Sequence, residues 1–99
     1  MTYQITLTAA EDAALSYVAF SQDNWIQNAV HERCRVAIEE IVGIAVQVCL
    51  QEGVQIPGTK DDIVALAFEK GWVKTAAQRQ AEAEAAAAER AAQEAQGAA

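Results

Sequence analysis

Residues 3–8 alternate strictly between apolar and polar side chains, with Tyr3, Ile5 and Leu7 as the apolar set. Successive side chains of a β-strand point to opposite faces, so this pattern predicts a short N-terminal strand with one apolar face. A lone strand leaves its backbone N–H and C=O groups unpaired, and no second segment of the chain alternates in this way. We therefore expect the strand to pair with the same strand of a second copy, which predicts a homodimer.

A first helix is predicted directly after this strand. Thr8 and Glu11 have the capping-box spacing, in which each side chain accepts a hydrogen bond from a backbone N–H at the start of a helix. The helix is expected from about Ala9 to Phe20. The polar residues that follow interrupt the pattern, and either Ser21 or Asp23 could cap the next helix.

A long helix over residues 24–52 is the clearest prediction in the sequence. The segment has no Pro and one interior Gly, and its polar positions recur every three or four residues: Asn28, Glu32, Arg35, Glu39, Gly43, Gln47 and Gln51. Its other positions are mainly apolar. A helix of about 28 residues extends roughly 42 Å, which is longer than the rest of this chain could cover. The uncovered apolar surface again favours a second subunit, and Gly53 is placed to end the helix.

A short third helix is predicted after the turn at residues 56–58. Thr59 is expected to cap a helix from Lys60 to Lys70, and Asp61 and Asp62 add favourable negative charge to its first turn. Gly71 followed by Trp72 is typical of a Schellman ending, in which the residue after the Gly packs back on the helix.

The last segment is rich in alanine, which accounts for thirteen of the final 25 residues. Thr75 and Gln78 repeat the capping-box spacing, and a helix is expected through about Gln96 because Ala has the highest helix propensity. No Leu, Ile or Val follows Val73, so this tail cannot form an ordinary heptad coiled coil. The predicted fold is mainly α: an N-terminal strand and four helices, divided into a domain over residues 1–74 and an Ala-rich helical arm over residues 75–99.

Apolar residues of the strand and the long helix are the candidates for self-association. The predicted oligomer interface consists of Ile5, Leu7, Ile38, Ile41, Val42 and Val46. Trp72 and Val73, at the point where the arm leaves the domain, are the predicted partner-binding residues, because a large aromatic side chain at a helix end is easily shared between chains.

Charge and composition exclude several classes of function. The net charge is −7, which opposes binding to nucleic acid phosphates and to anionic lipids. The longest mostly apolar stretch, residues 41–50, is too short to span a membrane. Two cysteines cannot form a disulfide framework, and no signal-peptide pattern opens the sequence. We expect no nucleic acid or membrane partner.

No residue constellation points to catalysis, a metal or a cofactor, so a non-enzymatic protein is expected. His31 and Cys34 are three residues apart, but two ligands do not make a metal site. Glu39 is expected to pair with Arg35 on the helix surface. Cys34 and Cys49 lie roughly 22 Å apart on one continuous helix and cannot form a disulfide within it. The sequence leaves open whether the Cys34 residues of two copies form a disulfide.

The order of a short strand, a helix, a tight polar turn and a second helix over residues 3–42 resembles the ribbon-helix-helix proteins. In that family two strands pair across a dimer, and their outward residues read the DNA major groove. Gln4 and Thr6 occupy the matching positions. Residues 1–53 carry seven acidic residues against Arg33 and Arg35, whereas DNA-binding members usually have basic strands, and the second helix is about twice as long as that plan needs.

A broader resemblance covers most of the chain. The sequence over residues 7–15, 23–35 and 37–42, then Ile56–Pro57 before a short helix and an Ala/Gln/Glu tail, resembles small uncharacterised proteins that tailed bacteriophages encode among their virion structural and tail genes. The resemblance implies a phage origin, a role in the virion or its assembly, and a location in the virion or in the host bacterial cytoplasm, and it assigns no functional residue.

The leading hypothesis is therefore a small structural or assembly protein of a bacteriophage particle. Such a protein would act by homo-oligomerisation, with a dimer as the expected state, and by helix-mediated contacts with other virion proteins. The alternative is a ribbon-helix-helix transcriptional regulator that binds DNA. A third hypothesis is an adaptor or inhibitor that binds a host protein through the Ala-rich arm.

Overall fold

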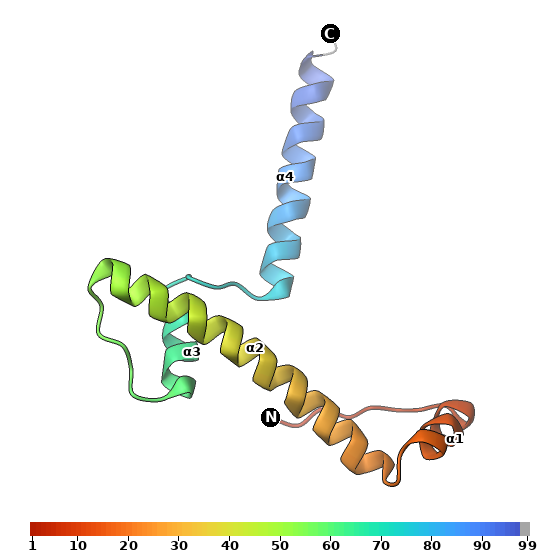
Figure 1. Cartoon of the computed structure of the whole chain (residues 1–99). Helices are drawn as coiled ribbons and strands as arrows, with labels where there is room; N and C mark the ends of the chain where they lie inside the picture. Colours follow the sequence, from red (N-terminus) through yellow and green to blue (C-terminus); the bar gives the residue numbers. More distant parts are fainter. Residues whose placement is uncertain (98–99) are drawn as a thin grey trace. The chain divides into compact units, whose positions relative to one another are not determined.

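A computed structural model describes residues 1–97 of the chain, which are mainly helical as predicted. The helices are α1 (Ala9–Val18), α2 (Gln22–Glu52), α3 (Lys60–Glu69) and α4 (Ala76–Gly97) (Figure 1). Each agrees with a predicted helix to within two residues at either end. The chain separates into two compact units, one formed by residues 1–39 and one that begins at residue 40. The predicted division into a domain over 1–74 and an arm over 75–99 stays a prediction.

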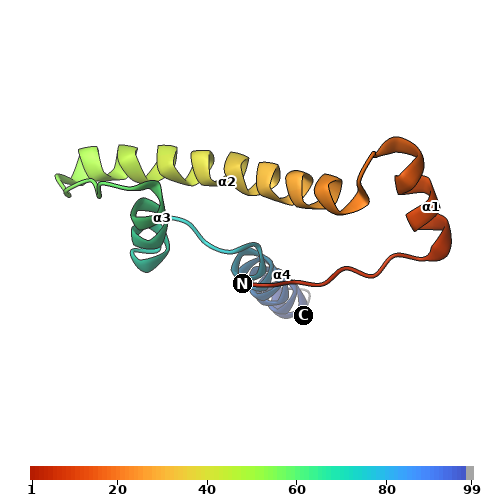
Figure 2. The same cartoon turned by 90° about the horizontal axis from the view of Figure 1, so that it is seen from below.

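The predicted N-terminal strand is absent from the described part of the chain. Residues 1–8 have no regular secondary structure, and Figure 2 shows them as an irregular segment that leads into α1. The alternating pattern sets which side chains share a face, but a strand also needs a neighbour for its backbone hydrogen bonds. The single chain supplies no such neighbour, so the strand does not form in it.

The start of α1 is the capping box that the sequence predicts. The backbone N–H of Glu11 donates to Thr8 Oγ1 at 3.1 Å, and the backbone N–H of Thr8 donates to Glu11 Oε1 at 3.0 Å. The helix ends at Val18 and not at Phe20, because Ala19 adopts an extended conformation with ψ 133°. Phe20 is left outside the helix and fully exposed.

The capping box makes the stability of α1 dependent on pH. The backbone hydrogen bond from Thr8, followed by the bond with its side chain, holds the pKa of Glu11 below its ordinary value near 4.5. A carboxyl group with a lowered folded-state pKa stabilises the fold above its ordinary pKa, and this contribution is lost as the pH falls through the folded pKa. The substitution Glu11→Gln keeps a hydrogen-bond acceptor but removes the carboxyl group that titrates. We expect the wild type to lose helicity by circular dichroism relative to Glu11→Gln between pH 5 and pH 3; equal losses would contradict this.

The ends of α2 and α3 follow local sequence signals. Ser21, one of the two candidate caps, accepts a hydrogen bond from the backbone N–H of Asn24 at 3.3 Å. Gly53 ends α2 with a φ of +69°, in the left-handed region that favours glycine. Gly71 ends α3 with a φ of +71°, and the next residue, Trp72, donates its backbone N–H to the Ala67 carbonyl at 2.9 Å. This is the predicted Schellman ending.

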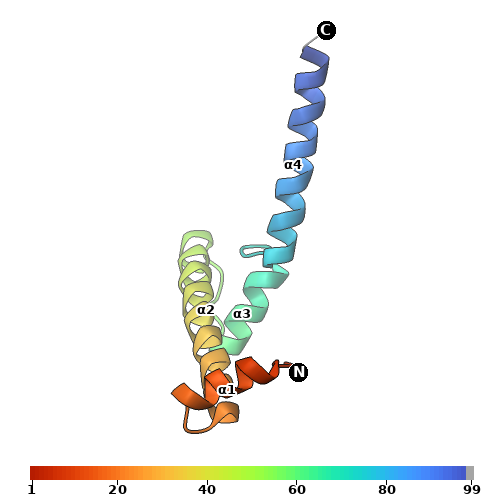
Figure 3. The ribbon, with the colours of Figure 1, turned by 90° about the vertical axis from the view of Figure 1, so that its right-hand side faces the viewer.

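A small core lies between the C-terminal half of α2 and α3, which run close to one another in Figure 3. Ala45 of α2 and Ala67 of α3 have no exposed surface, and Ile63 is almost fully buried beside them. The two alanines lack bulk, which allows the helices to approach closely. Trp72 and Val73 pack against this cluster from the segment after α3.

Candidate interaction surfaces

Few of the chain's apolar side chains are buried. Within residues 1–97 the buried side chains are Ala45, Cys49, Ile63 and Ala67, and all four belong to the unit that begins at residue 40. No residue of the unit formed by residues 1–39 is buried. Large hydrophobic side chains are instead exposed: Met1, Tyr3, Ile5, Tyr17, Val18, Phe20, Trp25, Val30, Ile44, Leu50, Ile56 and Phe68. Exposed apolar surface in such quantity is typical of a chain that associates with a protein partner.

An apolar hollow of about 530 Å³ lies within the first unit, between the N-terminal segment and the start of α2. Residues 1–5 form one wall, and Asp23, Ile26, Gln27, Val30 and His31 form the other. The lining is mainly apolar, and it contains no group of three or more metal-ligating side chains among the described residues. The hollow is therefore suited to an apolar side chain.

The predicted oligomer interface residues differ in their surroundings. Ile5 is 66% exposed, and Leu7, Ile38 and Val46 are half-buried. Ile41 and Val42 are also half-buried, because they pack against the α2–α3 core of their own chain. They therefore have an intramolecular role that the sequence pattern did not reveal, while their role in an oligomer stays a prediction.

The predicted partner-binding residues also contact the core of their own chain. Trp72 and Val73 are half-buried against the cluster of Ala45, Ile63 and Ala67. The Schellman turn at Gly71 directs Trp72 back onto α3 and accounts for this packing. Binding of a partner by these two residues stays a prediction.

On the surface of α2, Arg35 pairs with Glu32, a partner that the sequence analysis did not name. Arg35 forms a two-pronged contact with Glu32, at 2.6 Å from Nη2 to Oε1 and 3.0 Å from Nε to Oε2. This hydrogen-bonded contact lowers the pKa of Glu32 and raises that of Arg35, and Glu39, the predicted partner, raises the pKa of Arg35 further by its charge. Both Glu32 and Glu39 are within one helical turn of Arg35, so spacing alone does not choose between them. The exposed pair contributes little to stability.

The two cysteines of α2 differ in their exposure. Cys34 is exposed and Cys49 is buried, and both are free thiols. Among the residues that the structure describes, His31 and Cys34 have no third ligand that would complete a metal site. Cys49 packs as a small hydrophobic residue, whereas Cys34 is accessible to a second copy.

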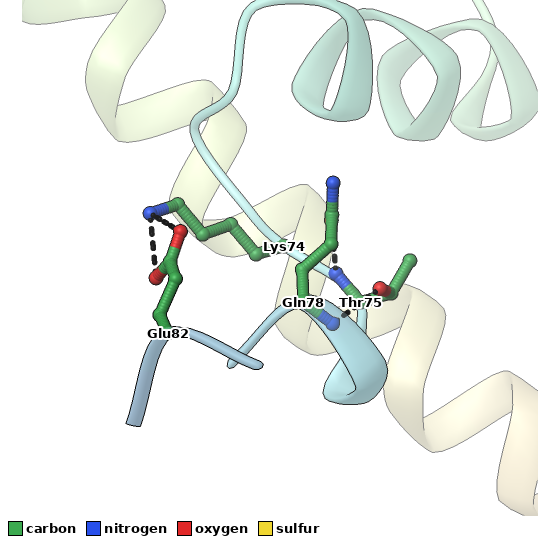
Figure 4. Close-up of polar contacts among 4 residues, drawn as sticks. All are labelled: Lys74, Thr75, Gln78 and Glu82. Atoms are coloured by element: carbon green, nitrogen blue, oxygen red, sulfur yellow. Dashed lines mark hydrogen bonds and ion pairs between the residues drawn. The ribbon is translucent and has the colours of Figure 1, made fainter. Parts of the chain in front are cut away.

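All described residues of α4 are exposed. The helix begins with the predicted capping box, since the backbone N–H groups of Thr75 and Gln78 each donate to the other residue's side chain, at 2.8 and 3.1 Å (Figure 4). Lys74 Nζ forms an ion pair with Glu82 at 2.7 Å in the same view. The start of α4 is thus fixed by local polar contacts and not by apolar packing.

Removing the arm should leave the core intact. A chain that ends at Lys74 loses residues 75–97, all of them exposed, together with the last two residues, so we expect its melting temperature to stay within about 5 °C of the wild type, because surface changes away from packed contacts have small effects. Differential scanning calorimetry measures this. Unfolding of the shortened chain would show that the arm belongs to the fold.

No helix in residues 1–97 combines the length and hydropathy needed to cross a lipid bilayer. No protein-family model, curated protein sequence or solved structure matches the chain. The candidate surfaces are therefore defined by this chain's own residues. The sequence reasoning overlooked two of them, the hollow beside Val30 and the exposed side chain of Ile44. Both could have been suspected from the apolar character of the long helix.

Proposed function

We propose that the protein is a small non-enzymatic structural or assembly protein of a bacteriophage particle, acting through homo-oligomerisation and helix-mediated contacts with other virion proteins. The observation that carries the proposal is the imbalance between a four-residue core and the large hydrophobic side chains left exposed in residues 1–97. A domain of this size buries a modest share of its surface and is often stabilised by association. The phage assignment is supported by the sequence resemblance described above.

Self-association would bury part of this exposed apolar surface. Burial of apolar surface stabilises by about 25 cal/mol per Å², so side chains such as Ile5 and Ile44 favour contact with another protein over exposure to water. Two copies would also supply the backbone partner that residues 3–8 lack, and the predicted strand would then form across the dimer.

Mass spectrometry of purified phage particles tests the assignment. The phage whose genome encodes the chain should carry it at a fixed copy number through density-gradient purification, or a phage lacking it should stall at a defined assembly intermediate. A phage that lacks the chain and yields normal numbers of infectious particles, with no copy of the chain in wild-type particles, would contradict the proposal.

A ribbon-helix-helix DNA-binding regulator is the second candidate. It is favoured by the order of an unpaired N-terminal segment, the α1 helix and the α2 helix, with Gln4 and Thr6 at the positions that read bases in that family. The negative charge of the N-terminal half argues against DNA binding, because residues 1–53 contain seven acidic residues and only two basic ones, Arg33 and Arg35.

We expect weak or no binding to duplex DNA at physiological salt. Contacts between Lys or Arg and phosphates dominate such affinity, and the chain has no basic residue before Lys60 other than Arg33 and Arg35. An electrophoretic mobility shift assay with random and genomic fragments measures it. Sub-micromolar, sequence-specific binding that Gln4→Ala abolishes would instead establish the regulator.

A further inference from the structure

Apolar residues of α2 form a heptad repeat. Six of them follow one another at alternating intervals of four and three residues: Val30, Cys34, Ala37, Ile41, Ile44 and Val48. This is the spacing at which two α-helices pack along a left-handed coiled-coil seam. Because α2 is a single helix from Gln22 to Glu52, these six residues share one side of it. They are called the α2 seam below.

The α2 seam is accessible. Val30 is 57% and Ile44 is 46% exposed, and Cys34 is exposed as well. The other three seam residues are half-buried. The α3 helix packs on a neighbouring side of α2, where Ala45 is fully buried. An apolar stripe of this kind can be buried by a second helix that carries a matching apolar stripe.

The charges beside the α2 seam indicate a second copy in antiparallel orientation. Arg33 and Glu40 are exposed and occupy equivalent flanking positions, seven residues apart. In an antiparallel pair of helices, equivalent flanking positions face each other, so Arg33 of each copy would meet Glu40 of the other. In a parallel pair, Arg33 would face Ile38 and Glu40 would face Ala45, and neither charge would gain a partner.

The same alignment also matches side-chain sizes. With Arg33 opposite Glu40, Val30 lies opposite Ile41 of the second copy, and Cys34 lies opposite its Ala37. The alignment pairs four of the six seam residues with one another, and among these four large side chains meet large ones and small ones meet small ones at the centre. Ile38 is half-buried and flanks the α2 seam on its other side, where it would face His31 of the second copy.

The apolar hollow provides an independent match. Val30 and Ile26 line it from α2, and Ile5 lines it from the N-terminal segment. The antiparallel alignment places Ile41 of the second copy opposite Val30, at this hollow. An isoleucine side chain is the kind of apolar group that its walls can accept.

We propose that two copies of the chain pair through their α2 seams in antiparallel orientation, with Arg33 and Glu40 as the reciprocal charge contacts. The inference rests on the homo-oligomerisation proposed above, and it adds the surface, the orientation and the specificity residues. Since the contact is two-fold symmetric, each charge contact occurs twice in a dimer.

Charge exchange in the full-length chain tests the proposal. Glu40→Arg places two Arg–Arg contacts in the dimer, and Arg33→Glu places two Glu–Glu contacts, so each should raise the dimer dissociation constant about tenfold in sedimentation equilibrium. The double variant Arg33→Glu/Glu40→Arg restores both contacts and should return within about threefold of the wild type. A mixture of the two single variants should form heterodimers in preference to either homodimer. Arg33 and Glu40 are exposed, so circular dichroism should show unchanged helicity in each variant.

A cysteine placed near the end of the α2 seam tests the orientation. In a Cys34→Ser background, the thiols of Val48→Cys would lie about 38 Å apart along the axes of an antiparallel pair and form no disulfide on oxidation. A covalent dimer through this position would establish a parallel pair and overturn the proposal. If the wild type is a dimer and no charge variant changes the dissociation constant, the α2 seam is not the dimer contact, although homo-oligomerisation stands. A monomeric wild type would overturn both proposals.

Discussion

Replacing Ile41 by Asp should convert the protein to a monomer. Ile41 lies in the α2 seam and also packs against the α2–α3 core, so the substitution places a carboxylate among apolar contacts on both sides. Burial of an unpaired charge is expected to cost about 4 kcal/mol, which corresponds to roughly a thousandfold weaker dimer. Sedimentation velocity at micromolar concentration measures the loss.

Two matched variants separate the interface from the core. Val30 belongs to the α2 seam, where it would face Ile41 of the second copy, but lies outside the α2–α3 cluster, so Val30→Asp should also give a monomer while the chain keeps its helicity. Leu50 is 72% exposed on the same helix and lies outside the α2 seam, so Leu50→Asp should leave the dimer unchanged. A dimeric Val30→Asp variant would exclude the α2 seam as the contact.

Ile63→Ala should produce the largest loss of stability from a change within the core. Ile63 is the largest side chain in the cluster with Ala45 and Ala67, and only 7% of its surface is exposed. Truncation of a buried isoleucine to alanine costs about 2–5 kcal/mol, and a core this small has few neighbours that could fill the cavity. Urea denaturation followed by circular dichroism provides the measurement.

Phe68→Ala is the control for this loss. Phe68 is the larger side chain on the same helix, but 41% of its surface is exposed, so its removal should cost less than that of Ile63. Equal or greater destabilisation by Phe68→Ala would show that the α2–α3 cluster is not the stabilising core.

Local signals in the sequence predicted most of the helical structure. The capping pairs Thr8–Glu11 and Thr75–Gln78 formed as expected, because both members of each pair lie within one helical turn. Gly53 and Gly71 marked helix ends for the same local reason, since glycine readily adopts a positive φ. These features need no information about the rest of the chain.

Contacts between distant segments could not be predicted in this way. The packing of Trp72 against Ala45 and Ile63 depends on where the chain returns after Gly53, and no short-range pattern specifies that path. The strand over residues 3–8 failed for a related reason, since its backbone requires a partner that a single chain does not provide. The heptad spacing of the α2 seam is present in the sequence, but the sequence does not show which side of α2 packs against α3.

Sedimentation equilibrium of the wild-type chain at micromolar concentration tests self-association most directly. The imbalance between a four-residue core and the exposed hydrophobic side chains predicts a dimer, with a mass twice the 10.6 kDa of the chain. A stable monomer of 10.6 kDa across the micromolar range would contradict it.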